Sequence, residues 1–331
     1  MFFCILAPVL LGGTIDHVFS PPTFDRWNYG FNGAPGSRSV GSTFSAFGSP
    51  YPFDNRDGQV LLGFVTGDSI DALWPASAYN ITTCTIELAI ASDDIPYDPT
   101  PDTWSTHHPD GPTDNDAGRP TIISGAAFRN GWDSWSFGED GAFGKAMESG
   151  VRNCYPIDFD VDGSARDISN NLSEFFDPNP WAVGTVDDVI PGDVIPAYTI
   201  VTFNVDVADP DVQCYLREAL SAGLADFMVT SLHPASEPGS GGSSNYPDWV
   251  FKENPLVALG ITSAASLRLS VDVSPPSGVP GDINGDSLVN VEDLLGVLEA
   301  FGRCPCCAAD LDGSGVVDVN DLLEIIGGWA G

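Results

Sequence analysis

The chain has 331 residues, with 12 Lys and Arg against 46 Asp and Glu, and its formal net charge is −34. A charge this negative excludes a surface that binds the phosphate backbone of nucleic acids or the headgroups of anionic lipids. Hydrophobic residues make up 43% of the chain, which is enough for a packed core and excludes disorder throughout. The scarcity of basic residues, together with 36 Gly and 27 Pro, favours strands and turns over long salt-bridged helices.

The start of the chain, residues 2–11, is an apolar run of the length of a signal-peptide core, too short to cross a bilayer. We therefore interpret residues 1–19 as a signal-peptide-like segment and expect a secreted protein, extracellular or periplasmic. The alternative is a buried first strand, because no basic residue precedes the run. No later run is long and apolar enough to suggest a membrane span.

Six cysteines follow Cys4, and an even number fits disulfides outside the cytosol. The pairing cannot be read from the sequence. Zinc binding at residues 304–307 is the weaker alternative, because no second Cys or His pair stands at structural-zinc spacing. The six are Cys84, Cys154, Cys214, Cys304, Cys306 and Cys307.

Residues 20–273 show strand-like segments separated by long polar loops. One helix is predicted between Asp209, which can cap its first turn, and Gly223, which can end it. We expect a mainly β fold, a jelly-roll-type β-sandwich with this one short helix packed on it. The predicted strands are residues 59–66, 81–90, 198–207, 226–231 and 266–273.

Several short motifs in this region follow a familiar order, including Asn28-Tyr29-Gly30 near the start, residues 61–64 and residues 251–254. This order resembles that of DNRLRE-type jelly rolls, which are carbohydrate-binding-module-like domains of secreted proteins. The resemblance implies a sandwich that binds carbohydrate or another surface. Residues 92–197 have no counterpart in it, and we predict a long loop-rich insertion there.

The first half of this insertion concentrates acids, histidines and aromatic residues. Carboxylates suit Ca²⁺ and exposed rings can stack on sugars, so one interpretation is a metal or sugar site. The other is a solvated acidic loop above ordinary core aromatics. The candidate ligand-binding residues are Tyr97, Trp104, Trp132 and Trp135.

Residues 274–280 are rich in Pro and Gly, and we expect an exposed linker there, followed by a separate unit over residues 281–331. In that unit, oxygen-bearing side chains stand at positions 1, 3, 5, 9 and 12 of a twelve-residue loop, with a backbone carbonyl at position 7, as in calcium loops. The pattern returns 28 residues later. The predicted Ca²⁺ ligands are Asp282, Asn284, Asp286, Leu288, Asn290 and Asp293 in the first loop, and Asp310, Asp312, Ser314, Val316, Asp318 and Asp321 in the second.

Because Asp286 stands where the second loop has Ser314, we expect the first loop to bind Ca²⁺ more tightly. Apolar residues follow each loop at matched helical offsets, so we expect two amphipathic helices that bury their apolar faces against each other. A segment of about 50 residues is otherwise too small to be stable, which makes the calcium structural. The matched residues are Leu294, Leu295, Val297, Leu298 and Phe301, and then Leu322, Leu323, Ile325, Ile326 and Trp329.

The prolines and cysteines that precede each loop leave no room for the entering helix of an EF-hand. Tandem loop-then-helix units resemble the dockerin family, whose members attach secreted polysaccharide-degrading enzymes and their accessory proteins to cohesin-bearing scaffolds. The resemblance implies a small α-helical domain, two bound Ca²⁺ ions and a cohesin-like partner. It also implies partner contacts by Val291, Glu292, Val319 and Asn320.

Two classes of function fit these patterns. The first is a secreted noncatalytic module that binds carbohydrate or a surface and carries a calcium-dependent docking tail. The second is a glycoside hydrolase or polysaccharide lyase with the same tail. A hydrolase needs two carboxyl groups about 5–10 Å apart in a cleft, which a sequence cannot display. The few glutamates before the linker stand in no recognised glycosidase motif, so we favour the first class and predict no catalytic residue.

Overall fold

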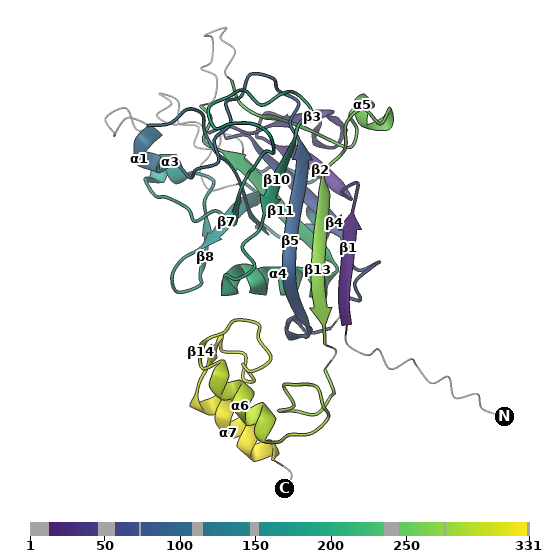
Figure 1. The fold of residues 1–331 in the computed structure, drawn as a ribbon, viewed down its shortest axis with the longest axis vertical. Helices are drawn as coiled ribbons and strands as arrows, with labels where there is room; N and C mark the ends of the chain where they lie inside the picture. Colours follow the sequence, from purple (N-terminus) through teal and green to yellow (C-terminus); the bar gives the residue numbers. More distant parts are fainter. Residues whose placement is uncertain are drawn as a thin grey trace, which may run out of the picture.

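The computed structural model describes residues 13–45, 57–72, 74–107, 115–145, 152–234, 245–274 and 276–329. The fold is mainly β, as predicted, and is built of antiparallel sheets. Figure 1 shows a β-rich body and, at one end of it, a small helical C-terminal unit. No helix within the described ranges is long and apolar enough to cross a membrane.

The smaller sheet of the body has four strands. β13 lies between β1 and β5, and β10 pairs with the other edge of β5. β1 pairs with β13 along its whole length, so residues 13–19, the last part of the segment predicted to be signal-peptide-like, form a strand of this sheet. Residues 1–12 lie outside the described part. In order, the strands are β1 (Gly13–Phe19), β13 (Ser266–Val273), β5 (Tyr79–Ala89) and β10 (Ile200–Asn204).

The larger sheet contains the strands predicted near residues 59–66 and 226–231, and five strands that were not predicted, the first of which is β2. β6, β7, β8 and β9 all fall within residues 92–197, and β6 pairs with both β11 and β7. The predicted loop-rich insertion therefore contributes a large part of this sheet. The strands are β2 (Phe24–Asn28), β4 (Gln59–Val65), β11 (Leu224–Ser231), β6 (Thr121–Phe128), β7 (Cys154–Phe159), β8 (Ala165–Asp167) and β9 (Ala182–Val183), with β3 (Val40–Ser42) paired to β12 (Asp248–Val250) nearby.

The two sheets enclose one hydrophobic core, which is the arrangement of a β-sandwich. Phe64 on β4 and Phe227 on β11 share this core with Ile86 on β5 and Leu269 on β13. β4 and β11 are buried on both faces, because a second apolar cluster covers the outer side of the larger sheet. That cluster contains Phe137, from the short helix α2 (Ser134–Phe137).

Helix α4 (Pro210–Ala222) connects β10 to β11 and has the ends that the sequence predicts. The Asp209 carboxylate accepts hydrogen bonds from the backbone N–H groups of Asp211 and Val212, and Gly223 closes the helix with a φ of 78°. An αL residue at this position is a common helix stop that glycine adopts without a Cβ clash. The remaining short helices are α1 (Trp104–His107), α3 (Asn171–Glu174), α5 (Pro255–Ala258) and the 3₁₀ turns η1 (Pro35–Ser37) and η2 (Ala76–Ala78).

The C-terminal unit has the predicted order of loop, helix, loop, helix. Its helices are α6 (Val291–Glu299) and α7 (Val319–Gly328), and its two short strands are β14 (Gly302–Arg303) and β15 (Val316–Val317). Val297 and Ile325 meet in a small core of its own. The unit therefore has the local organisation expected for residues 281–331.

Candidate functional site

Each of the two predicted calcium loops folds around the carboxylate at its first position. The Asp282 carboxylate accepts hydrogen bonds from the N–H groups of Gly285, Asp286 and Ser287, at 2.8, 3.2 and 2.7 Å. In the second loop Asp310 accepts from Ser314 at 3.0 Å and from Gly315 at 2.7 Å. The backbone therefore already curls around the first predicted ligand of each loop.

The aspartates at position 12 close the loops in the same way. Asp293 Oδ1 accepts from the N–H of Ile283 at 2.9 Å, and its Oδ2 accepts from the N–H of Asn290 at 2.8 Å. Asp321 makes the matching bonds to Leu311, at 2.7 Å, and to Asp318, at 2.8 Å. Burial opposes ionisation of Asp321, but these hydrogen bonds outweigh it and hold the pKa of Asp321 below its ordinary value. A carboxylate in this state is ready to bind a cation.

The donor set fits calcium better than other metals, because each loop offers only oxygen ligands from side chains. In the second loop one oxygen from each of Asp310, Asp312 and Asp321 lies within 4.8 Å of the other two. In the first loop Asn284 stands at position 3, where the second loop has Asp312. Counted over all positions, the second loop has four carboxylates and the first has three. The prediction that the first loop binds Ca²⁺ more tightly, which was drawn from position 5, therefore stays a prediction that a binding measurement has to decide.

Of the ten matched apolar residues that were predicted to be buried after the two loops, six are exposed. Val297 and Ile325 are fully buried, with Leu294 and Leu322 packed beside them. The other matched residues lie outward, because two helices of this size can cover only one narrow stripe each. The exposed set, which we call the α6/α7 apolar face, is 40–58% exposed at every member and consists of Val291, Leu295, Leu298, Phe301, Val319, Leu323, Ile326 and Trp329.

The predicted partner-contacting residues lie at the edge of this face. Val291 and Val319 are the first residues of α6 and α7 and belong to the face itself. Glu292 and Asn320 follow them and are exposed. Figure 1 places α6 and α7 at the far side of the C-terminal unit, away from the two sheets. The face is therefore accessible to a partner.

The near side of the C-terminal unit is attached to α4 by side chains that the sequence did not single out. Arg303 on β14 makes a bidentate ion pair with Asp211 at the start of α4. Arg217 Nη1 donates a hydrogen bond to the carbonyl of Cys306 at 3.1 Å. A cleft of about 420 Å³ lies between the two parts, lined by α4, the β7–β8 turn and residues 314–316 of the second predicted calcium loop. No local sequence signal identifies Arg303 or Asp211, because their contact spans 92 residues.

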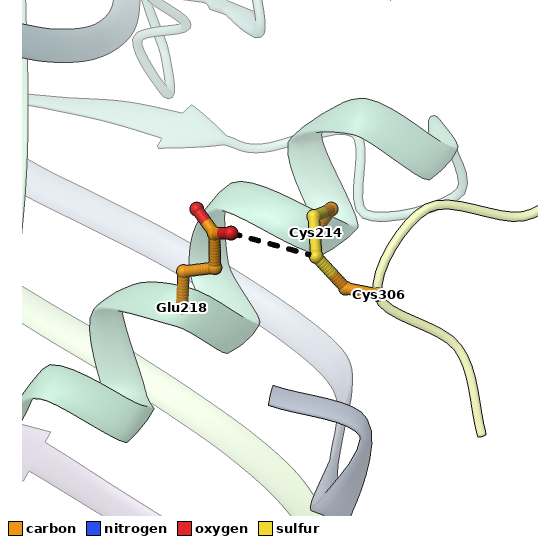
Figure 2. A group of neighbouring side chains, drawn as sticks. All are labelled: Cys214, Glu218 and Cys306. Atoms are coloured by element: carbon orange, nitrogen blue, oxygen red, sulfur yellow. Dashed lines mark hydrogen bonds between the residues drawn. A yellow bond between two sulfur atoms is a disulfide. The ribbon is translucent and has the colours of Figure 1, made fainter. Parts of the chain in front are cut away.

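Two disulfides form among the cysteines whose pairing the sequence left open. Cys214 on α4 bonds to Cys306, with Cα atoms 5.3 Å apart, and Cys304 bonds to Cys307, at 5.7 Å. Figure 2 shows Cys214 and Glu218 side by side on α4, with Cys306 extending to them from the C-terminal unit. Glu218 Oε1 lies 3.8 Å from the Cys306 sulfur. The remaining described cysteines, Cys84 and Cys154, are free and buried.

The four predicted ligand-binding aromatics do not form one platform. Tyr97 is 7% exposed and belongs to the core, where its hydroxyl accepts a hydrogen bond from Val186, so its prediction as a contact residue is wrong. Trp132 packs edge-on against Phe137, and Trp104 packs against Phe175. Trp135, in contrast, is 58% exposed and free to meet a ligand.

A group of carboxylates in the body surrounds Lys252. Its ammonium lies 3.6 Å from Asp25 and 3.5 Å from Glu253, and it also pairs with Glu139. Burial raises the pKa of Asp25 to about 7, with the charge of Lys252 opposing the shift and that of Glu253 adding to it. The single positive charge of Lys252 offsets only part of the negative charge of the three acids, and its ion pairs join β2 to the segment before α5.

No protein-family model and no curated protein matches this sequence. The assignment of function therefore depends on the geometry of the two loops, the α6/α7 apolar face and the body that carries them.

Proposed function

We propose that this protein is a secreted noncatalytic module with two parts. The body is a jelly-roll-type sandwich that binds carbohydrate or another surface. The C-terminal unit is dockerin-like: it binds two Ca²⁺ ions and docks onto a protein partner, for which a cohesin-like scaffold domain is the first candidate.

The observation that carries this proposal is the duplication within the C-terminal unit. Position 1 and position 12 make equivalent carboxylate–backbone bonds in both loops, and the helices after them expose equivalent apolar residues. A unit of this size has a small core, so the free energy from bound calcium is needed to hold its helices. Calcium then fixes the relative positions of the two halves of the α6/α7 apolar face.

Docking is favoured because the exposed residues of the α6/α7 apolar face belong to two helices that pack against each other, and are not scattered over the surface. Large exposed apolar patches on soluble proteins usually mark interaction sites. Leu295 and Leu323 stand at its centre by their matched positions, one turn after the first residue of each helix. Acidic residues such as Glu292 and Glu324 border it, which suits a partner whose apolar centre has a basic rim.

The jelly-roll assignment of the body is supported by the path of the chain. The chain crosses repeatedly between the two sheets: β4 lies in the larger, β5 in the smaller, β6 and β7 in the larger, β10 in the smaller, β11 in the larger and β13 in the smaller. Repeated crossing between two packed sheets is the hallmark of such rolls. Binding residues on sandwiches usually stand in the connections between strands. Trp135, on α2 in the connection from β6 to β7, is exposed there.

The calcium claim is tested on the full chain by calcium titration in a calorimeter. We expect Asp293→Asn to remove the first-loop site and Asp321→Asn to remove the second-loop site, while Glu299→Gln, an exposed change on α6, leaves both unchanged. If neither aspartate variant alters calcium binding, the dockerin-like assignment is wrong.

The docking claim is tested with immobilised cohesin-like domains in calcium and in EDTA. We expect calcium-dependent retention that Leu295→Asp and Leu323→Asp together abolish without changing calcium binding. Retention that survives both substitutions contradicts the role of the α6/α7 apolar face. For the body, a panel of polysaccharides is scored for retention and for released reducing ends; we expect retention alone, and release that a single Asp or Glu substitution removes would favour a polysaccharide-degrading enzyme.

A further inference from the structure

Three carboxylates outside the calcium loops meet on the surface of the sandwich body. Asp98 and Asp102 lie in the segment that follows β5, and Asp116 lies in the segment that leads into β6. One oxygen from each of the three lies within 4.8 Å of the other two. The cluster therefore brings together acids from both ends of a connection that the sequence analysis had treated as an insertion.

The floor of this cluster is built on the core. Tyr97, next to Asp98, donates its N–H to the carbonyl of Asp193 at 2.8 Å and accepts at its own carbonyl from Gly192 at 2.7 Å. Asp98 itself is only 5% exposed. Its side chain is thus held in place by a backbone that has little freedom to move.

The oxygens of Asp98 are not equally satisfied. Oδ1 accepts hydrogen bonds from the N–H of Thr100 at 2.9 Å and from its hydroxyl at 2.6 Å. The same hydroxyl lies 2.9 Å from Asp116 Oδ2, but it has one proton and can serve only one acid at a time. Oδ2 of Asp98 is buried with no hydrogen-bond partner. A buried carboxylate oxygen without a partner is costly unless a cation meets it.

The charge of the cluster points the same way. Its three carboxylates carry three negative charges when ionised, and Arg119, whose Nη1 lies 3.7 Å from Asp102 Oδ2, supplies one positive charge. The Asp102 side chain is 6% exposed, so water screens little of the repulsion at the floor, while Asp116 is exposed at the rim. Asp116 is therefore the exposed member of the cluster, whereas Asp98 and the Asp102 side chain are shielded from water.

We propose that Asp98, Asp102 and Asp116 bind one divalent cation of the calcium type in the sandwich body, independently of the C-terminal loops. Asp98 Oδ2 gains the positive partner that it lacks, and the repulsion among the three acids is relieved. The ligands are all oxygens and are unequally buried, which suits the flexible coordination of Ca²⁺ better than the strict octahedron of Mg²⁺. The ion ties the segment after β5 to the segment before β6.

The test uses the full chain with both C-terminal loops silenced by Asp293→Asn and Asp321→Asn. Equilibrium dialysis against Ca²⁺ should still find one ion per chain, and Ca²⁺ should still raise the melting temperature of the body. Tb³⁺ offers a local readout, because Tyr97, next to Asp98, can sensitise its luminescence. Adding Asp98→Asn should lower calcium affinity at least tenfold and remove the luminescence.

Asp93→Asn is the matched control, since Asp93 is exposed on the same segment and outside the cluster. Asp116→Asn is the second variant, because it changes the exposed rim and leaves the buried floor intact should Asp98→Asn fail to fold. If the loop-silenced chain binds no Ca²⁺ at millimolar concentration, or if it binds equally well after both cluster substitutions, the proposed site is refuted. Failure of the C-terminal loops would instead appear as unchanged binding when those loops are silenced.

Discussion

The disulfide between Cys214 and Cys306 allows a direct test of how the C-terminal unit is held. The perturbation is the double substitution Cys214→Ser with Cys306→Ser. The bridge closes a loop between residues 92 positions apart, for which the chain-entropy relation gives about 4–5 kcal/mol of stabilisation at 25 °C. We expect the melting temperature to fall by about 10 °C, at roughly 2 °C per kcal/mol for a chain of this size.

The assay for the bridge itself is electrophoresis after a cut in the linker. A recognition sequence for a site-specific protease replaces residues 275–279, and the chain is cleaved there. Without reductant the parent chain should migrate as one species, because the two fragments remain joined, and with reductant it should give two. The double-Ser chain should give two fragments under both conditions. Two separate fragments from the parent without reductant would refute the bridge, and an unchanged melting temperature in the double-Ser chain would refute its stabilising role.

Three further predictions concern single contacts. Burial raises the pKa of Asp226, which is 2% exposed, to about 7, so the folded state binds this proton more tightly than the unfolded state does. The free energy of unfolding should therefore fall by up to about 4 kcal/mol as the pH rises from about 4 to 7. Urea titrations across this pH range should show a smaller decrease for Asp226→Asn than for the parent chain. Gly125→Ala should cost about 1–3 kcal/mol in the same assay, because its Cβ would lie 2.3 Å from the Trp181 ring, whereas Gly33→Ala, with open space around it, should cost much less. Arg303→Ala and Asp211→Asn should each destabilise the attached unit and be non-additive in a double-mutant cycle by about 1 kcal/mol; full additivity would mean that their ion pair contributes nothing.

Features set by neighbours in the sequence were predictable. Helix α4 begins after Asp209 and ends before Gly223 because its caps are local, and the calcium-loop pattern is a spacing rule within twelve residues. The strands near residues 81–90 and 266–273 have an apolar pattern strong enough to be read alone. In each case the information that fixes the element lies within it.

Features set by distant contacts were not predictable. β6 contains Ser124-Gly125 at its centre, which interrupts a strand pattern, and the reason for the glycine is the Trp181 ring packed against it. The helical offsets of α6 and α7 showed which residues are apolar but not that Leu295 and Leu323 would remain outside the core. The acids of the Asp98 cluster were visible as a local excess of charge, whereas their meeting depends on the path of the connection from β5 in the smaller sheet to β6 in the larger sheet.

The attachment of the C-terminal unit to α4 also determines how mechanical load would pass through the molecule. A partner that pulls on the α6/α7 apolar face would load two covalent paths in parallel, the short segment 274–280 and the bridge from Cys306 to Cys214. The first path ends on β13, which lies inside the smaller sheet between β1 and β5 and would be peeled from it. The second path ends on α4, so part of the tension does not pass through the smaller sheet. The body of a protein held by both paths should therefore stay folded at a force that would unfold a body anchored through β13 alone.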